Sequence, residues 1–145
     1  MLKGIPKILS PEMLKVLCEM GHGDRIMIGD GNFPTESVGK DSVILRCDGH
    51  NVPELLDAVL TLMPLDLSVE KPIHLMAVPD GVIADTSIWK TYEKIISAHD
   101  ARGVDTVGFY ERFEFYDQAK KCYALVATGE EKLYANIMLQ KGVVI

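Results

Sequence analysis

The chain has 145 residues, of which 48% are hydrophobic and 25% are charged. These proportions are typical of one globular domain and exclude intrinsic disorder as the main state. The formal net charge is −6 and no long basic run is present, which argues against a nucleic-acid-binding protein or a polybasic membrane anchor. No apolar segment approaches the roughly 20 residues of a membrane-spanning helix. We therefore expect a soluble, cytoplasmic protein.

The first predicted element is a helix that begins at Ser10-Pro11-Glu12, because Ser10 can cap it and proline is well tolerated in the first turn. Gly21 and Gly23 end this helix. The remaining predicted elements are, in chain order, strands at Arg25–Ile28 and Val43–Arg46, a helix at Pro53–Met63, a strand at Ile73–Val78, a helix at Ser87–His99, a strand at Thr106–Tyr110, a helix at Phe113–Lys121, and strands at Tyr123–Thr128 and Tyr134–Leu139.

This alternation of strands and helices predicts an α/β fold: a single layered domain, residues 1–145, with a largely parallel or mixed central sheet flanked by helices. The last two predicted strands are joined by a short connection. They can therefore pair antiparallel, which would make the sheet mixed. No internal repeat or linker divides the chain.

The three cysteines, Cys18, Cys47 and Cys122, lie far apart and form no C-x-x-C pair. Neither a zinc site nor a redox dithiol is indicated, and we expect reduced thiols. The sequence also lacks a metal-binding histidine motif, a phosphate-binding loop and a glycine-rich dinucleotide motif. We therefore expect neither a metal nor a cofactor.

Polar and turn-forming residues are densest between Gly21 and Pro34. His22 stands between two glycines, and its imidazole is suited to donate or accept a proton near neutral pH. The alternative is a turn residue that caps the last carbonyl groups of the preceding helix. Asp24 is expected to anchor that turn through backbone N–H groups.

Asp30 follows a predicted strand, at the position where open α/β sheets bind ligands. The alternative is an Asx turn. At about 3.3 Å per residue, a straight strand would separate His22 and Asp30 by over roughly 20 Å. Both can serve one site only if the chain folds back or if each belongs to a different subunit.

Two further clusters could bind a ligand. Arg112 carries a planar fork of donors that suits vicinal hydroxyl groups or a carboxylate, and aromatic side chains follow it. The alternative is a solvated arginine at the start of an amphipathic helix. Tyr134 and Asn136 lie two residues apart on one face of a predicted strand. The alternative for this pair is an ordinary edge-strand surface.

The segments Gly21-His22-Gly23-Asp24 and Asp30–Pro34 resemble the signature of the RbsD/FucU family of sugar mutarotases. The similarity covers nearly the whole chain. The further segments that agree with the family in order and spacing are Ser10-Pro11-Glu12, Arg112-Phe113 with Phe115-Tyr116, Thr128-Gly129-Glu130, Tyr134-Ala135-Asn136 and Lys141-Gly142-Val143. Gly-His-Gly-Asp and Arg112 match the fucose-type branch of the family, whereas Ala135 is found in the ribose-type branch.

The resemblance implies a cofactor-free isomerase that interconverts the α and β anomers of L-fucose by acid/base-catalysed ring opening and closure. By the same resemblance, His22 is the catalytic acid/base. The residues implied to bind the sugar are Asp30, Arg112, Tyr134 and Asn136. Tyr116 is a further candidate for sugar binding. The partner of His22 in proton transfer stays open between Tyr116, Asp30 and a water molecule.

The resemblance also implies a ring-shaped homo-oligomer, commonly a decamer, with each site at a subunit interface. The seven methionines and the large apolar share of so short a chain point the same way, because they leave apolar surface beyond one small core. Two alternative functions remain open: ribose pyranase-type interconversion of pyranose and furanose forms, and non-catalytic binding of fucose.

Overall fold

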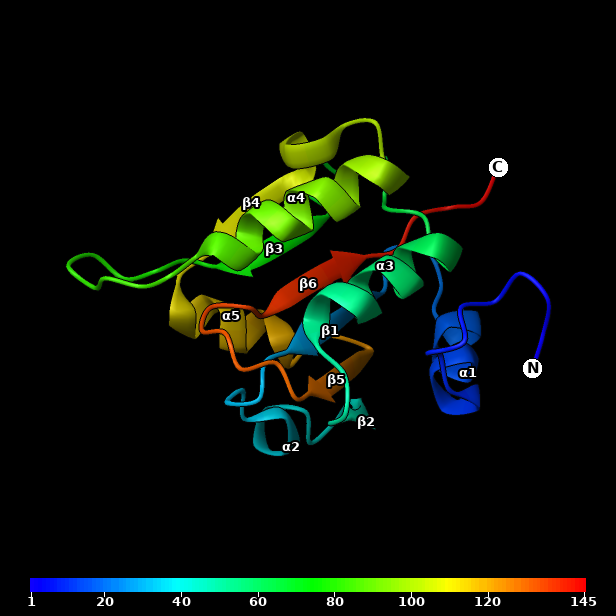
Figure 1. Ribbon diagram of the computed structural model, residues 1–145, viewed down its shortest axis with the longest axis horizontal. Coiled ribbons are helices and arrows are strands. Elements are labelled where there is room, and N and C mark those ends of the chain that lie inside the picture. The colour runs from blue at the N-terminus through cyan, green and yellow to red at the C-terminus, as the bar shows by residue number, and fades with distance from the viewer.

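The computed structural model describes residues 1–145, which form a six-stranded sheet with helices on both faces (Figure 1). The strands lie in the order β2-β5-β1-β6-β3-β4. Five of them run in the same direction, and β6 alone is antiparallel to its neighbours β1 and β3. The strands are β1 (Arg25–Gly29), β2 (Val43–Cys47), β3 (Ile73–Met76), β4 (Val107–Tyr110), β5 (Ala124–Thr128) and β6 (Ile137–Gln140).

The predicted mixed α/β sheet is confirmed, but the predicted pairing of its last two strands is wrong. β1 lies between β5 and β6, so that Ile28 faces Val126 on one side and Ile137 on the other. β5 pairs with β1 and β2, and each of its residues is buried because both faces of the sheet are covered there. The segment 129–136 is long enough to pass across the end of β1, so the chain does not need to form a hairpin there.

The helices follow the predicted ones closely. They are α1 (Pro11–Glu19), α2 (Thr35–Val38), α3 (Val52–Leu62), α4 (Ser87–His99) and α5 (Arg112–Ala119), with a 3₁₀ helix at Gly103–Thr106. The predicted cap is present, since the Ser10 hydroxyl accepts a hydrogen bond from the Met13 N–H at 3.1 Å. The short α2 was not predicted. None of these helices is both long and apolar enough to cross a membrane.

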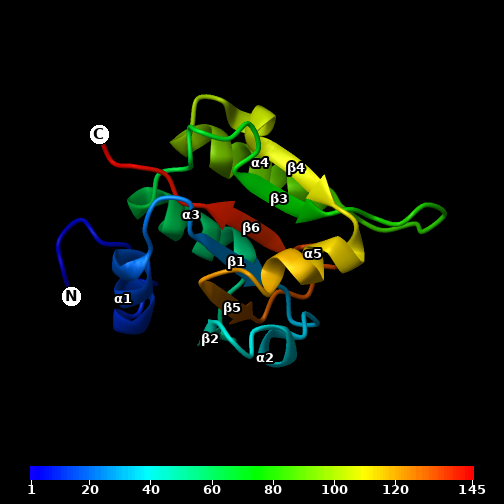
Figure 2. The same cartoon turned by 180° about the vertical axis from the view of Figure 1, so that it is seen from behind.

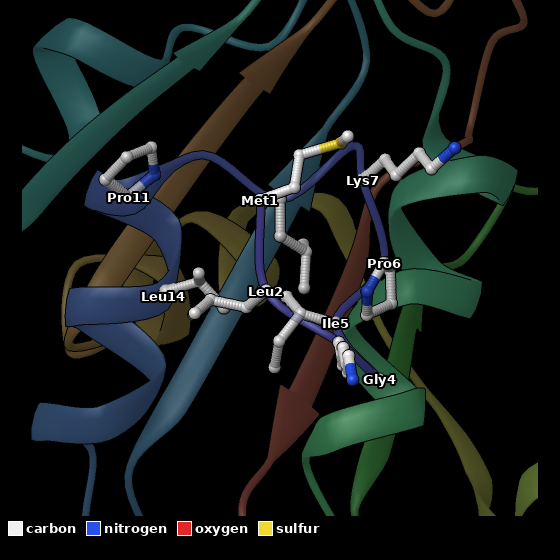
Figure 3. Close-up of a pocket in the computed structure, with 10 residues that line it drawn as sticks. Met1, Leu2, Gly4, Ile5, Pro6, Lys7, Pro11 and Leu14 are labelled. Carbon is white, nitrogen blue, oxygen red and sulfur yellow. The ribbon is translucent and has the colours of Figure 1, made fainter.

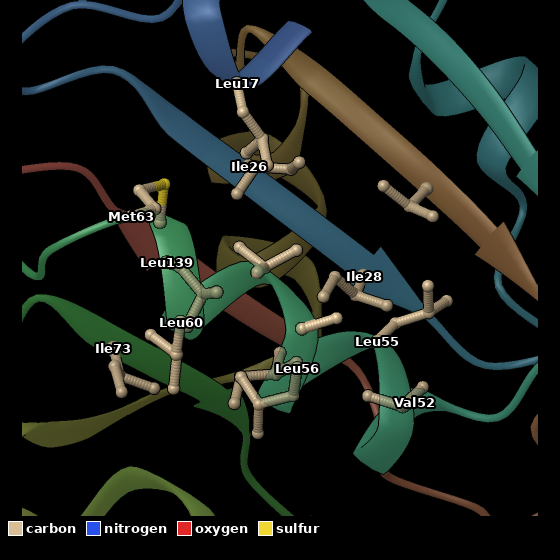
Figure 4. Close-up of a cluster of buried hydrophobic side chains, with 14 of the residues drawn as sticks. Leu17, Ile26, Ile28, Val52, Leu55, Leu56, Leu60, Met63, Ile73 and Leu139 are labelled. Atoms are coloured by element: carbon tan, nitrogen blue, oxygen red, sulfur yellow. The ribbon is translucent and has the colours of Figure 1, made fainter. Parts of the chain in front are cut away.

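The larger core lies between one face of the sheet and the helices α1, α3 and α4. Figure 4 shows the side chains of α3 pointing into it, and Leu55 and Leu56 are fully buried there against Ile28 and Ile73. Burying a side chain of this size contributes about 1.5–3 kcal/mol. The face of α3 that packs on the sheet is therefore apolar, and its helical spacing made this helix recognisable in the sequence.

The opposite face is covered in part by α5 (Figure 2). Phe115 and Ala119 of this helix are buried against Met27, Leu125 and Met138 of the sheet. Because five strands run the same way, their carboxyl ends meet at one edge of the sheet, together with the start of β6. The segment 77–86, between β3 and α4, projects beyond this edge (Figure 1).

Candidate functional site

Asp30 lies directly after β1, at the carboxyl edge of the sheet, and it is buried. Its backbone N–H donates to Asn136 Oδ1 at 2.8 Å, and its own Oδ1 accepts from the Asn32 N–H at 3.0 Å. The second bond is the Asx turn that the sequence offered as an alternative. Burial raises the pKa of Asp30, although backbone hydrogen bonds oppose this shift. The structure thus brings Asp30 and Asn136 into contact.

A second buried carboxylate, Glu130, supports the Asp30 loop. Its backbone carbonyl accepts from the Gly31 N–H at 2.8 Å, and its side chain accepts from the backbone N–H groups of Val52 at 3.3 Å and Lys132 at 3.0 Å. The Thr128 hydroxyl donates to the Gly29 carbonyl at 2.7 Å. Glu130 therefore ties the segment after β5 to the segment after β1.

The prediction that Tyr134 and Asn136 share one face of a strand is wrong, because β6 begins only at Ile137. Tyr134 has a left-handed backbone, with φ at 55°. Two side chains of α4 hold this segment: Trp89 Nε1 donates to the Tyr134 carbonyl at 2.8 Å and the Tyr92 hydroxyl donates to the Ala135 carbonyl at 2.6 Å. In a strand, these carbonyl groups would accept hydrogen bonds from a neighbouring strand, whereas here the side chains of α4 supply the donors.

Arg112 and Tyr116 lie on the first turns of α5, at the same edge of the sheet. The Glu111 side chain accepts from the backbone N–H groups of Phe113 and Glu114 and so fixes where the helix begins. Arg112 Nε donates to the Tyr116 hydroxyl at 3.3 Å, and the guanidinium is exposed. Its two terminal nitrogens make no hydrogen bond within the chain, so they are available to a ligand.

Aromatic side chains connect the two parts of this edge. The Tyr116 ring lies 5.5 Å from the Phe33 ring, measured between centroids, and both belong with Tyr134 to one apolar cluster. Carboxyl, amide and guanidinium groups are suited to sugar hydroxyls, and aromatic faces are suited to the C–H side of a sugar ring. Five of the six predicted site residues thus lie at this carboxyl edge: Asp30, Arg112, Tyr116, Tyr134 and Asn136.

His22 lies at the opposite end of β1 and does not meet Asp30 within the chain. Its Nε2 is 3.0 Å from Asp66 Oδ1, and its side chain is 51% exposed. The alternative role in capping α1 is wrong, because the imidazole contacts Asp66 and Ser68 and no carbonyl group of that helix. The Met20 carbonyl at the end of α1 accepts from Lys141 Nζ at 2.6 Å instead. Asp24 anchors the turn as predicted, accepting from the Gly21 N–H at 2.7 Å.

A pocket of about 680 Å³ lies between the N-terminal residues 1–7 and α1 (Figure 3), and none of the residues that line it belongs to either polar cluster. Its lining is mainly apolar, with Lys3 and Lys7 as the titratable side chains. A second hollow, under the 77–86 segment, contains Trp89 and Phe109 and adjoins the carboxyl edge. No three His, Cys, Asp or Glu side chains come together in a way that could hold a metal ion.

Residues 3–144 match the model of the RbsD / FucU transport protein family. The chain belongs to this family. The fucose mutarotase of Mus musculus is 51% identical, over 97% of this chain and 94% of its own length. FucU from Bifidobacterium longum superposes with a TM-score of 0.97 at 55% identity, over 99% of this chain and 100% of its own.

A third relative was crystallised with its sugar. The fucose mutarotase of Streptococcus pneumoniae in complex with L-fucose has a TM-score of 0.92 and 50% identity, over 99% of this chain and 100% of that chain. Membership of the RbsD/FucU family, which the resemblance in the signature segments indicated, is therefore confirmed together with its α/β fold.

Sequence reasoning missed the residues that surround His22. Asp66 Oδ1 and the Ser68 hydroxyl lie 3.0 Å and 3.5 Å from its Nε2, and Gln140 Nε2 donates to Asp66 Oδ2. Asp66 is separated from His22 by 44 positions, and Asp66-Leu67-Ser68 looks like an ordinary polar loop after a helix. Asp66 could have been singled out only by its burial, and burial of a single aspartate cannot be read from the sequence.

Proposed function

We propose that this chain interconverts the α and β anomers of L-fucose through acid/base-catalysed opening and closure of the pyranose ring. The observation that carries the proposal is the cluster of buried Asp30 with Asn136 at the carboxyl edge, next to the exposed fork of Arg112. It occurs in a chain that is 50% identical to a fucose mutarotase crystallised with L-fucose.

The reaction moves two protons and breaks one bond. One proton leaves the anomeric hydroxyl while another reaches the ring oxygen, and the bond between the anomeric carbon and the ring oxygen breaks to give the open-chain aldehyde. Rotation of the aldehyde and the reverse transfers close the ring with the other configuration. A positioned acid/base accelerates such transfers by about 10²–10⁴-fold, and His22 is the proposed group.

Binding is assigned to the carboxyl edge of the sheet. Arg112 would donate in a paired manner to neighbouring hydroxyl groups, and Asp30 and Asn136 would accept from and donate to others. The rings of Tyr116 and Tyr134 would face the C–H side of the sugar. In proton transfer, Tyr116, Asp30 or a water molecule would act opposite His22.

We propose further that His22 reaches the sugar from a neighbouring subunit. This arrangement is supported by the positions of His22 and Asp30 at opposite ends of β1, since one chain cannot bring both to one sugar. Exposed apolar side chains near the carboxyl edge, among them Ile83 and Phe113, are consistent with an interface there. The proposed assembly is a closed homo-oligomeric ring, in keeping with the decamer expected from the family resemblance.

Saturation-transfer NMR of the anomeric protons of L-fucose tests the proposal. Irradiation of one anomer should reduce the signal of the other when the protein is present and should have little effect when it is absent. D-ribose in a parallel sample tests pyranose–furanose exchange. Binding of fucose with no acceleration of exchange would show a sugar-binding protein and contradict the proposal, as would acceleration for ribose alone.

The variant His22→Gln tests the assignment of the proton-transfer group. Because the side chain is half exposed, we expect the fold to persist while exchange falls by about 10²-fold or more. Fucose affinity, measured by calorimetry, should change little. Wild-type exchange at pH 7 in this variant would contradict the role of His22.

A further inference from the structure

We propose that Trp89 and Tyr92 of α4 are positioning residues for sugar binding. Their side chains hold two successive peptide units of the segment 134–136, and so fix Tyr134 and Asn136 where a sugar would meet them. This inference rests on the proposed function, because Tyr134 and Asn136 are assigned to binding there.

The segment 134–136 depends on partners from outside itself. It lies between β5 and β6 and belongs to neither strand. Tyr134 is the one residue other than glycine with a positive φ, at 55°, a conformation that is unfavourable for a side chain with a Cβ. Donors that are held in place by another element can therefore decide which backbone conformation this segment adopts.

The first of these donors is the indole of Trp89, whose Nε1 donates to the Tyr134 carbonyl at 2.8 Å. The indole packs against the Phe109 ring, with 5.1 Å between centroids. Burial raises the pKa of Asp30, and backbone N–H groups, that of Ala135 among them, oppose this shift. The Ala135 N–H and the Tyr134 carbonyl belong to one peptide unit. Trp89 and Asp30 thus hold that unit from its two sides.

The second donor is the hydroxyl of Tyr92, which is buried and donates to the Ala135 carbonyl at 2.6 Å. Burial raises the pKa of Tyr92, and the charges of Glu130 and Asp30 raise it further. The hydroxyl therefore keeps its hydrogen and acts as a donor. The peptide unit that it holds leads directly into Asn136, whose Oδ1 accepts from the Asp30 N–H at 2.8 Å.

Both donors are carried by a helix that is anchored in the larger core. Trp89 and Tyr92 are three residues apart on α4 and so lie on the same face of this helix. Ile88 and Ile96 of α4 are buried in the core cluster. The geometry of the segment 134–136 is therefore set by a rigid element before a ligand arrives.

The variants Trp89→Phe and Tyr92→Phe test this role, because each removes one donor and keeps an aromatic ring. We expect fucose affinity, measured by calorimetry, to fall about three- to tenfold in each, the worth of one hydrogen bond. Exchange at saturating fucose should change less, because His22 lies at the opposite end of β1.

Urea unfolding of the same variants separates positioning from stability. A merely structural residue would lower the unfolding midpoint and leave the fucose affinity of the folded protein unchanged. Wild-type affinity in either variant would overturn the positioning role of that residue.

Tyr123 provides a matched control. Its hydroxyl donates to Glu19 Oε2 at 2.6 Å, at an exposed position beside α1. Tyr123→Phe removes the same kind of group and should leave fucose affinity unchanged. Equal losses of affinity in Tyr92→Phe and Tyr123→Phe would contradict a specific role of Tyr92.

The wild-type protein allows a test without any variant that could fail to fold. Trp89 is the only tryptophan, so the spectrum contains one indole N–H resonance and needs no assignment. In D₂O we expect this hydrogen to exchange more slowly than that of free tryptophan, because it is engaged with the Tyr134 carbonyl. Saturating L-fucose should slow it further, because a sugar bound to the segment 134–136 would hold that carbonyl in place. The absence of either effect would overturn the inference.

Failure of the proposed function gives a different result. If the wild-type protein neither binds L-fucose nor accelerates its exchange, the proposed function fails. If the wild-type protein does both and the two variants bind L-fucose as tightly as it does, the positioning role alone fails.

Discussion

At the residue scale, each of the two polar clusters combines an exposed side chain with buried ones. The side chain of His22 is 51% exposed, whereas that of Asp66, which holds it, is 3% exposed. Arg112 is likewise exposed, while Asn136 beneath the same edge is buried. The exposed His22 is thus in contact with a buried carboxylate, and the buried Asp30 and Asn136 are held by hydrogen bonds to the backbone, an arrangement that fixes geometry before a ligand arrives.

Arg112→Lys tests the planar fork. A lysine keeps the charge but cannot make paired hydrogen bonds to neighbouring hydroxyl groups, so we expect fucose affinity to fall by about tenfold, equivalent to about 1.4 kcal/mol. Titration calorimetry measures it. Arg46→Lys, at an exposed arginine paired with Asp48, should bind fucose normally. Unchanged affinity of Arg112→Lys would make this arginine a solvated helix residue.

Burial raises the pKa of Asp66, but hydrogen bonds from Ser68 and Gln140 outweigh this and hold the pKa well below its usual range. This shift predicts a pH-dependent contribution to stability. Because the folded-state pKa lies below the unfolded value of about 3.9, the ionised group stabilises the fold above that value and loses this effect as the pH falls. The difference in unfolding free energy between wild type and Asp66→Asn should therefore shrink between about pH 5 and pH 3. Urea unfolding at several pH values measures it, and a constant difference would contradict the ionised state.

At the scale of elements, the sequence was most informative where one face is buried. The helix predicted at Ser87–His99 matches α4 at both ends, because Ile88, Tyr92 and Ile96 recur at helical spacing and are buried. The segment before β6 was wrongly extended as a strand. Its carbonyl groups are paired by Trp89 and Tyr92, and side-chain partners so distant in the chain leave no local pattern.

Strand pairing was also beyond the sequence. The alternation of strands and helices predicted the α/β class. It does not say which strands pair, so the position of β1 between β5 and β6 could not be predicted. At the site, the candidate residues could be chosen from residue type, turn context and family resemblance. The separation of His22 from Asp30 could be predicted from the length of the strand between them. The contacts of Asp66 with His22 and of Glu130 with the Asp30 loop are visible only in the folded structure.

The turn after β5 gives a prediction at this scale. A Cβ on Gly129 would collide with the backbone carbonyl oxygen of Asp48, whereas a Cβ on nearby Gly49 would meet no atom within 4 Å. Gly129→Ala should therefore destabilise the protein by about 1–3 kcal/mol and disturb the Asp30 loop through Glu130. Gly49→Ala should have little effect. Thermal unfolding of both variants measures the difference, and equal midpoints would contradict the close approach of Gly129 to the Asp48 carbonyl.

At the scale of the whole molecule, one chain places the two proposed parts of the site at opposite ends of β1. The carboxyl edge carries the proposed sugar-binding groups, and the other end carries His22 with its support. A closed ring in which each chain offers one end to each neighbour would unite them without any change of fold. A lone chain should accordingly be inactive, even when it is folded and able to bind sugar weakly.

Complementation between two inactive variants tests this arrangement most directly. His22→Gln and Asp30→Asn chains, each expected to lose anomer exchange alone, are co-expressed with different tags and purified as mixed oligomers. If each site takes His22 from one chain and Asp30 from another, random mixing in equal amounts should restore about a quarter of the sites, and saturation-transfer NMR of L-fucose should detect the recovered exchange. Mixed oligomers without recovery, or a monomer near 16.1 kDa with full exchange activity, would contradict the composite site.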